Sequence, residues 1–244
     1  MLIKDPHFKV NIDLDGSSPS PDKSIWRAQH TCVSETYAFN GKVPKNPAKA
    51  VIDHQLRVKH WSVLDFGFVV LHFDGFPHDT VMQLARHQDS SPLVQSMRYT
   101  GKRIQDVCDM GGDTAFEALE SLFYCQPVGQ YAARSGGTYI VSKEQRQQHL
   151  YGCWQSCMDY DRAIRAGWPE ESARRELKSG YRQGFVMAGT IRAVFHWLDQ
   201  RTLSDTQIEA QTLAWMALEE LKMWSPEFFQ WYELNRAGKN QLAP

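Results

Sequence analysis

The chain has 244 residues, with 27 Lys and Arg residues, 28 Asp and Glu residues and a formal net charge of -1. This length fits one domain whose core buries most of the apolar surface. The near-neutral charge excludes a general electrostatic attraction to nucleic acid or to an anionic membrane, so any anion-binding site must be local.

The five cysteines are an odd number and do not form the pattern of a secreted disulfide framework. A reducing cytoplasm is the simpler location for such a chain. Its apolar runs are shorter than a membrane span, and the N-terminus lacks the basic and apolar regions of a signal peptide. We therefore expect a soluble, cytoplasmic protein.

The first quarter of the chain predicts a strand, a loop and two helices. Residues 8–12 are strand-like, and the Asp, Gly, Ser and Pro residues of 13–21 predict a loop. Residues 24–35 and 46–58 have the spacing of amphipathic helices. Ser34 closes the first of these helices, where a serine is most simply a cap or surface residue.

Residues 60–73 combine polar side chains with a predicted buried strand. His60 and Ser62 precede Phe66 to Phe73, a run with the length and β-branched content of such a strand. Taken alone, His60 is most simply a structural histidine bonded to backbone.

Residues 75–104 contain the densest group of side chains that can bind anions. Pro77, followed two residues later by an aspartate, predicts a helix start. Gln83, Arg86 and His87 then lie toward the end of that helix.

A loop and an extended segment are expected to follow this helix, because Pro92 prevents its continuation. Ser96, Arg98 and Thr100 alternate with apolar residues and should share one side of the extended segment. Arg86, Ser96 and Arg98 would then converge on one anion, and a phosphate suits two guanidinium groups and a hydroxyl. On spacing alone, ordinary surface arginines are the favoured interpretation.

The second half is predicted to be mainly helical. A capping box at Ser142 to Gln145 opens a helix that runs to Gly167, and Ser204 to Gln207 caps a final helix that ends before Pro226. Further helices are expected at 113–124 and 169–177, a strand at 138–141, and disorder at 236–244.

Cys153 and Cys157 lie one turn apart on the predicted helix after Ser142. Thiols at this spacing are candidate metal ligands, but no matching ligand pair is near in the sequence. We expect two core or surface thiols and no metal site.

Residues 191–201 raise a question of geometry. In an uninterrupted helix, at about 100° per residue, Arg192 and His196 share a face whereas Arg192 and Arg201 point in opposite directions. Either the helix ends near Asp199, or the two arginines serve different ligands. Two exposed arginines in salt bridges are the plainer alternative.

These spaced motifs resemble those of the flavin-dependent thymidylate synthases. The family signature is Arg-His-Arg, seven residues, then Ser with Arg-Tyr just beyond; it matches Arg86-His87, Ser96 and Arg98-Tyr99, with Gln88 in place of the second arginine. Residues 75–78 and 95–101 are most similar to the cyanobacterial branch.

Two other segments extend the resemblance to roughly residues 20–225. His60 to Phe66 resembles the family's His-x-Ser/Thr-x-x-Glu-His, with Asp65 and Phe66 at its last two positions. The block from Ala173 to Glu209 resembles the family's C-terminal half, with departures at Lys178, Thr190 and Gln200.

The resemblance implies an α+β fold with a central sheet and long helices, in a single domain of residues 1–244 whose ends, 1–20 and 236–244, are peripheral. It also implies a homotetramer with active sites at subunit interfaces. The implied reaction converts dUMP to dTMP with FAD as cofactor, NADPH as electron donor and 5,10-methylenetetrahydrofolate as one-carbon donor, and it involves no nucleic acid or membrane. Two alternatives stay open: a related flavoenzyme that modifies another pyrimidine nucleotide, and a nucleotide-binding homologue without catalysis.

The resemblance also implies roles for individual residues. Arg201 and Ser96 are the catalytic candidates, with Ser96 expected to be a ligand rather than a nucleophile because arginines, not bases, surround it. The implied dUMP ligands are Gln83, Arg86, Ser96, Arg98, Arg174 and Arg201. The implied FAD ligands are Ser34, His60, Ser62, Arg86, His87, Gln88, Thr190, Arg192 and His196.

Overall fold

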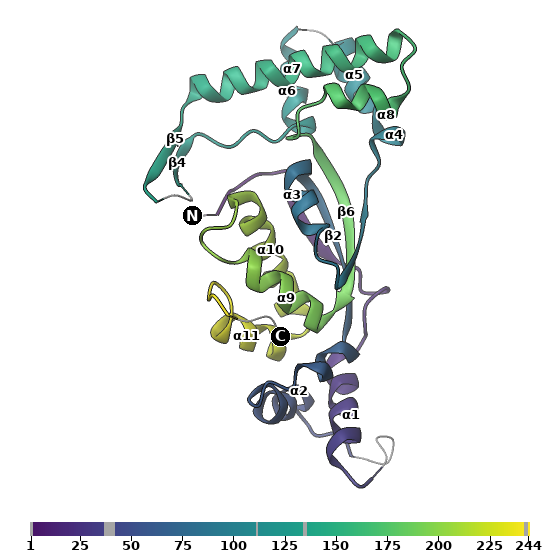
Figure 1. The fold of residues 1–244 in the computed structure, drawn as a ribbon, viewed down its shortest axis with the longest axis vertical. Helices are drawn as coiled ribbons and strands as arrows, with labels where there is room; N and C mark the ends of the chain where they lie inside the picture. The colour runs from purple at the N-terminus through teal and green to yellow at the C-terminus, as the bar shows by residue number, and fades with distance from the viewer. Residues whose placement is uncertain (1, 37–41, 111, 134–135, 242–243) are drawn as a thin grey trace.

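The computed structural model describes residues 2–36, 42–110, 112–133, 136–241 and 244. It is a mixed fold of helices and antiparallel sheet, as the sequence predicts (Figure 1). In the described part of the chain, no helix is both long and apolar enough to span a membrane.

A four-stranded antiparallel sheet forms the middle of the molecule, in the order β1 (Lys9–Ile12), β2 (Phe68–Pro77), β6 (Arg182–Thr190) and β3 (Ser90–Val94). Alternate residues of β2, including Val69, Leu71 and Phe73, are buried. Phe73 stacks on Phe185 of β6 with ring centroids 4.5 Å apart. The sheet thus buries one face against helices, which is the usual arrangement for an antiparallel sheet.

Helices from several parts of the chain form the first hydrophobic core with this sheet; those that follow β2 and β6 lie alongside it, and the two N-terminal helices lie beyond its lower end (Figure 1). Short π- and 3₁₀-helical turns at Ile52–Leu56 and Trp61–Phe66 join the second of these helices to β2. The helices are α1 (Pro21–Val33), α2 (Pro47–Val51), α3 (His78–Leu84), α9 (Ile191–Arg201), α10 (Ile208–Trp224) and α11 (Pro226–Asn235).

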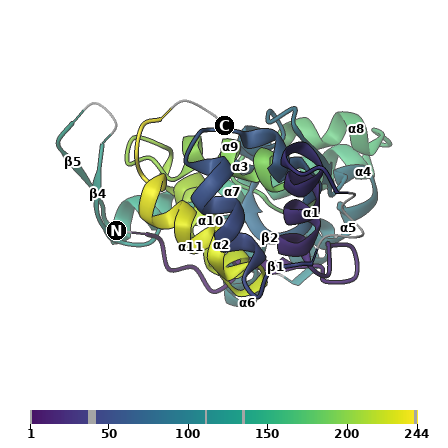
Figure 2. The ribbon, with the colours of Figure 1, turned by 90° about the horizontal axis from the view of Figure 1, so that it is seen from below.

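A second core lies in a helical unit at one end of the molecule, at the top of Figure 1. Its longest helix is capped by Ser142, with the predicted capping box. A hairpin projects from this unit (Figure 2). The elements are α4 (Met97–Thr100), α5 (Lys102–Met110), α6 (Gly112–Leu122), β4 (Gly129–Ala132), β5 (Thr138–Val141), α7 (Lys143–Arg165) and α8 (Glu170–Ala173), with a 3₁₀ turn at Arg174–Glu176.

The prediction for residues 89–100 is wrong in two places. Ser90 and Ser91, expected in a loop, begin strand β3, and Pro92 is tolerated there because β3 is an edge strand. Residues 97–100, expected to be extended, form helix α4, and the Ser96 side chain caps it by accepting a hydrogen bond from the Arg98 amide at 3.4 Å. Ser96 and Arg98 therefore do not share one side of a strand.

The C-terminal prediction also needs correction. Pro226 ends α10 as expected but is also the first residue of α11, a position that suits the fixed φ of proline. Arg236, expected to begin a disordered tail, is buried and paired with Asp199 of α9.

The Arg236–Asp199 pair ties the end of the chain to the first core. Arg236 Nη2 donates to Asp199 Oδ2 at 2.6 Å, Tyr232 Oη donates to Asp199 Oδ1 at 3.0 Å, and both charged side chains are at most 5% exposed. Burial raises the pKa of Asp199, while Arg236 acts in the opposite direction. The guanidinium also lies 4.9 Å from the centroid of the Trp61 ring.

We expect Arg236→Leu to lower the free energy of unfolding by about 3–5 kcal/mol, because the Asp199 carboxylate would stay buried without its cation. The matched control is Arg162→Leu, which removes an Arg–Asp pair whose side chains are 75% and 43% exposed and should cost less than about 1 kcal/mol. Urea unfolding of the three proteins measures both changes. Equal losses of unfolding free energy in the two variants would show that the buried pair stabilises the fold no more than an exposed pair does.

Candidate functional site

Helix α9 presents the site candidates of the C-terminal half on two sides. It runs without a break to Arg201, which removes the alternative that it ends near Asp199. Arg192, near its start, contacts Asp65, whereas Arg201, at its end, contacts the segment after α3. The two arginines therefore face different surroundings.

Arg201 is held by two hydrogen bonds. Its Nε donates to Nε2 of His87 at 3.1 Å, and its Nη2 donates to the carbonyl oxygen of Gln83 at 3.2 Å. That carbonyl belongs to the last turn of α3, where carbonyls lack partners within the helix. The guanidinium is thereby oriented by the end of a second helix.

The acceptor role of His87 requires a neutral imidazole. Its side chain is buried, and burial followed by the charge of Arg201 lowers the pKa of His87 from 6.5 to about 4. Burial also lowers the pKa of Arg201, with a further contribution from Arg86. At neutral pH the pair is therefore a charged donor and a neutral acceptor.

His196 lies beside His87, with the two rings edge to face and their centroids 6.0 Å apart. Its Nδ1 is 2.8 Å from Oδ2 of Asp89, and its Nε2 is 2.9 Å from the side-chain nitrogen of Gln200. A carboxylate at Nδ1 favours a proton there, which leaves Nε2 of the neutral ring to accept from the amide.

Sequence reasoning missed Asp89 and Gln200 as parts of this network. No sequence signal gave Asp89 a role, and Gln200 stood out only as a departure from a motif. One signal was available for Gln200, because it follows His196 by four residues on a predicted helix and such residues are neighbours. The contact with Asp89 joins segments 107 residues apart, which no local pattern predicts.

Arg192 and Thr190 form a third group at the start of α9. Thr190 caps the helix by accepting from the Ala193 amide, and its hydroxyl donates to Oδ1 of Asp65 at 3.3 Å. Arg192 Nη1 donates to the other oxygen of Asp65, also at 3.3 Å, and both of these charged side chains are 41% exposed. An exposed pair of this kind contributes less than about 1 kcal/mol, so a phosphate can replace Asp65 as the partner of Arg192.

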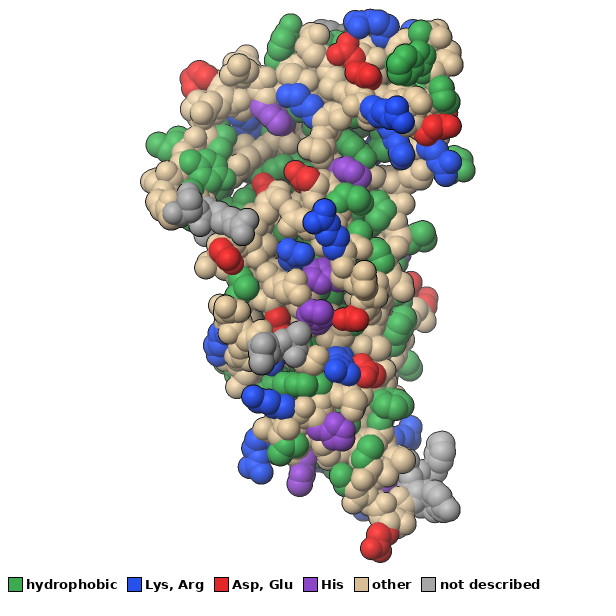
Figure 3. Space-filling view, in the orientation of Figure 1, with side chains coloured by type: hydrophobic (Ala, Val, Ile, Leu, Met, Phe, Trp, Pro, Cys, Tyr) green, Lys and Arg blue, Asp and Glu red, His purple; other side chains and the backbone are tan. Residues whose placement is uncertain are grey.

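A cavity of about 1180 Å³ opens between α3, the end of α9 and the hairpin β4–β5. Gln83, Arg86 and Arg201 line it together with Gln130 and Tyr131 of the hairpin. On the face drawn in Figure 3, basic and histidine side chains gather down the middle of the molecule, over α3 and α9. Three of the six candidate dUMP ligands thus share one polar cavity.

The other three candidates lie in the helical unit. Arg98 lines a separate hollow of about 380 Å³ with Tyr99, and Arg174 is exposed after α8. Ser96 follows Ser90 by six residues of mostly extended chain, a separation of about 20 Å. The expected convergence of Arg86, Ser96 and Arg98 on one anion therefore does not occur within one chain.

The remaining flavin candidates lie near α1 and before β2, apart from Gln88, which is exposed next to His87. Ser34 Oγ is 2.9 Å from the Thr36 hydroxyl. His60 Nδ1 is 2.7 Å from Oε1 of the buried Gln55, and Ser62 is exposed on the following 3₁₀ turn. These side chains belong to α1 and to the turns before β2, the elements at the lower end of Figure 1.

The chain matches the family model described as thymidylate synthase complementing protein over residues 14–227. It is 25% identical to a flavin-dependent thymidylate synthase from Haloarcula marismortui over 96% of this chain and 100% of that protein. A flavin-dependent thymidylate synthase from Halobacterium salinarum is 26% identical over 91% of this chain and 90% of its own length.

Two solved structures share the fold. Thymidylate synthase X from Helicobacter pylori, crystallised with FAD and dUMP, superposes with a TM-score of 0.71 at 14% identity and covers 91% of this chain and 97% of its own. The UMP/dUMP methylase PolB from Streptomyces cacaoi, bound to 5-Br dUMP, superposes with a TM-score of 0.71 at 19% identity over 100% of this chain and 99% of its own.

The buried neutral His87 predicts a specific dependence of stability on pH. Between pH 6.5 and about 4 the unfolded chain protonates this histidine while the native protein does not, so its contribution to stability is lost as the pH falls. His87→Gln keeps an acceptor for Arg201 but does not titrate. In urea unfolding at a series of pH values, the parent should lose stability relative to the variant across this window, and parallel pH profiles would contradict the assignment.

Proposed function

Because the chain belongs to the thymidylate synthase complementing protein family, we propose that it is a flavin-dependent thymidylate synthase, a methyltransferase that converts dUMP to dTMP. The observation that carries the proposal is the cavity in which Gln83, Arg86 and Arg201 meet, beside His87 and His196. Relatives named flavin-dependent thymidylate synthase, aligned over nearly the whole chain, support the same activity.

The donor set of α9 and the segment after α3 fits a flavin dinucleotide. Arg192 and Arg86 are exposed enough to bind its phosphates, and His196, Thr190 and Gln88 add neutral donors and acceptors nearby. When bound, FAD supplies the redox chemistry of the reaction. In this proposal NADPH is the reductant, 5,10-methylenetetrahydrofolate is the one-carbon donor, and Ser34, His60 and Ser62 belong to the flavin side of the site.

Arg201 is the residue assigned to the chemical step. The hydrogen bonds to His87 and to the Gln83 carbonyl fix its guanidinium at the wall of the cavity before any ligand binds. A fixed cation stabilises negative charge that develops on a pyrimidine as C5 becomes nucleophilic, with little reorganisation at that moment. The low pKa of His87 supports this role, because a protonated imidazole would repel Arg201 and offer it no acceptor.

Ser96 is assigned to substrate binding. Its oxygen already accepts from the Arg98 amide as the cap of α4. A serine nucleophile needs a general base within hydrogen-bond reach, whereas Ser96 makes its hydrogen bonds to backbone and hydroxyl groups of its own turn.

The complete site in this proposal is shared between copies of the chain in a homotetramer. Ser96, Arg98 and Arg174 of one copy would face Arg86 and Arg201 of another, because within one chain Arg98 lines a different hollow from Arg86 and Arg201. Exposed apolar side chains support a covered surface here: Leu93 of β3 is 76% exposed and Tyr99 of α4 is 82% exposed.

A complementation experiment tests the shared site. Arg98→Ala and Arg201→Ala should each abolish most dTMP formation, and oligomers assembled from equal amounts of both variants should regain up to about a quarter of the parent activity, because one site in four then receives both arginines. Two variants that alter the same side of the site, Arg201→Ala with Gln83→Ala, are the matched control and should not restore activity. A mixture of the first pair that stays inactive after confirmed subunit exchange would place both arginines in one copy.

The activity itself is tested with the purified protein. Visible absorption bands of oxidised flavin should accompany it, and NADPH with 5,10-methylenetetrahydrofolate should yield dTMP from dUMP. UMP and dCMP are assayed in parallel, because one protein of the same fold is a UMP/dUMP methylase. A product from UMP or dCMP but not from dUMP would favour the related pyrimidine-modifying flavoenzyme, and a colourless protein that binds dUMP but not FAD would favour a non-catalytic homologue.

A further inference from the structure

Two thiols and an imidazole meet at the junction between the helical unit and the hairpin. The ligand atoms of Cys125, His149 and Cys153 all lie within 4.8 Å of one another. His149 and Cys153 are one turn apart on α7, and Cys125 lies on the segment between α6 and β4. The structure therefore groups Cys153 with Cys125 and His149, whereas the sequence spacing suggested Cys157 as its neighbour.

We propose that Cys125, His149 and Cys153 bind a zinc ion, with two thiolates and one imidazole as protein ligands and a fourth position open to a neighbouring cavity. Thiolate and imidazole are the donors that zinc prefers, and three protein ligands leave room for a water or another ligand.

The geometry of the cluster suits this ion. Tetrahedral zinc with typical bond lengths places its ligand atoms about 3.5–3.8 Å apart, so a cluster that spans at most 4.8 Å needs only small side-chain rotations to close around the metal. Residues four apart on a helix present their side chains to the same side. The third ligand comes from another segment, so the bound ion would tie that segment to α7.

Burial and charge at the cluster also favour a cation. Cys125 is 3% exposed and Cys153 is fully buried, and a buried pair of thiolates needs a cation to compensate it. Two thiolates balance the charge of the ion, and the exposed side chain of His149 gives a route for its entry.

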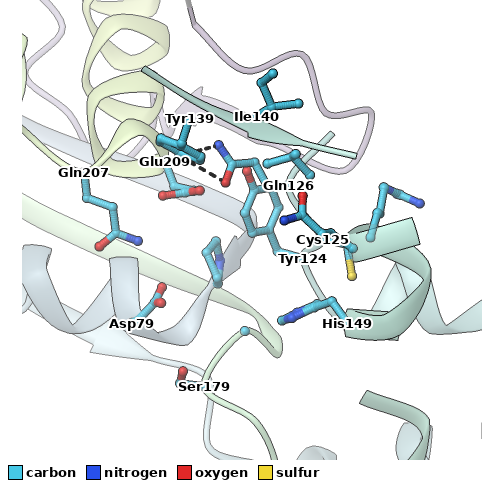
Figure 4. Close-up of a pocket in the computed structure, with 15 residues that line it drawn as sticks. Asp79, Tyr124, Cys125, Gln126, Tyr139, Ile140, His149, Ser179, Gln207 and Glu209 are labelled. Atoms are coloured by element: carbon cyan, nitrogen blue, oxygen red, sulfur yellow. Dashed lines mark hydrogen bonds between the residues drawn. The ribbon is translucent and has the colours of Figure 1, made fainter. Parts of the chain in front are cut away.

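The fourth position faces a cavity of about 420 Å³, shown in Figure 4. Cys125 and His149 lie on one side of this cavity, with Asp79, Gln207 and Glu209 among the side chains across it. Cys153 lies behind this lining, so an ion bound by all three side chains would lie in the wall of the cavity. Gln207 and Glu209 line the larger cavity of the proposed active site as well, so the two cavities are neighbours.

The full-length protein, purified in reducing buffer and supplied with Zn²⁺, tests the proposal by elemental analysis. One zinc ion per chain is expected. His149→Ala changes an exposed residue and so preserves the fold, and it should weaken Zn²⁺ binding in competition with a chelator by more than the roughly 10–100-fold that loss of an outer partner causes. Cys157→Ser, which removes a buried thiol one turn further along α7, is the matched control and should retain the parent affinity.

The absorption spectrum of the protein with Co²⁺ in place of Zn²⁺ identifies the ligands. A thiolate-to-cobalt charge-transfer band, with visible bands typical of four ligands, should appear in the parent and in Cys157→Ser and disappear in Cys125→Ser. The proposal is overturned if neither ion binds, or if His149→Ala keeps the parent affinity. It is also overturned if Cys125 and Cys153, trapped by alkylation as the cells are broken, prove to be joined in a disulfide.

Discussion

Strand β6 is hydrogen-bonded along both edges, to β2 on one side and to β3 on the other, and this double pairing sets the positions of α3 and α9, which carry Gln83 and Arg201 of the proposed site. The strand leads without a loop into α9, whose cap is its last residue, Thr190. Its neighbour β2 leads equally directly into α3. The ends of α3 and α9 are therefore set side by side by backbone hydrogen bonds, and the contact of Arg201 with His87 is a consequence of the sheet.

Charge on this surface is compensated locally, which agrees with a chain of net charge -1. Arg192 is paired with Asp65, whereas the hydrogen bonds of Arg201 go to the neutral His87 ring and to the Gln83 carbonyl oxygen. A cation bound to neutral groups keeps its full attraction for a ligand anion, while an exposed ion pair must first exchange its partner. In the proposed function, Arg201 would thus be a permanent cation at the pyrimidine side and Arg192 an exchangeable one at the flavin side.

Local sequence patterns predicted the elements whose stability is local. The capping box at Ser142, the buried β-branched run of β2 and the helix that carries Arg192 and Arg201 appear as expected. The errors at Ser90 and at Arg236 have a tertiary cause: pairing with β6 makes a strand from residues with loop propensity, and the buried Asp199 orders a polar terminus. For the site, residue types and their approximate segments were predictable, but not the cluster of Cys125 with Cys153, because its ligands lie on different elements.

The distance between the two halves of the proposed nucleotide site is also a property of β6. To bring Arg98 to Arg201 within one chain, β3 would have to leave its five-residue pairing with β6. Each lost backbone hydrogen bond costs about 1 kcal/mol, and more where the groups stay buried. Such an opening would also uncover Met187 and Phe185, which belong to the first core. A conformational change of this size is a poor route to a binding site. A second copy of the chain can instead supply Ser96 and Arg98 with every strand pair intact. The strand pairing that separates Arg98 from Arg201 within one chain therefore favours a site in which they meet between two chains.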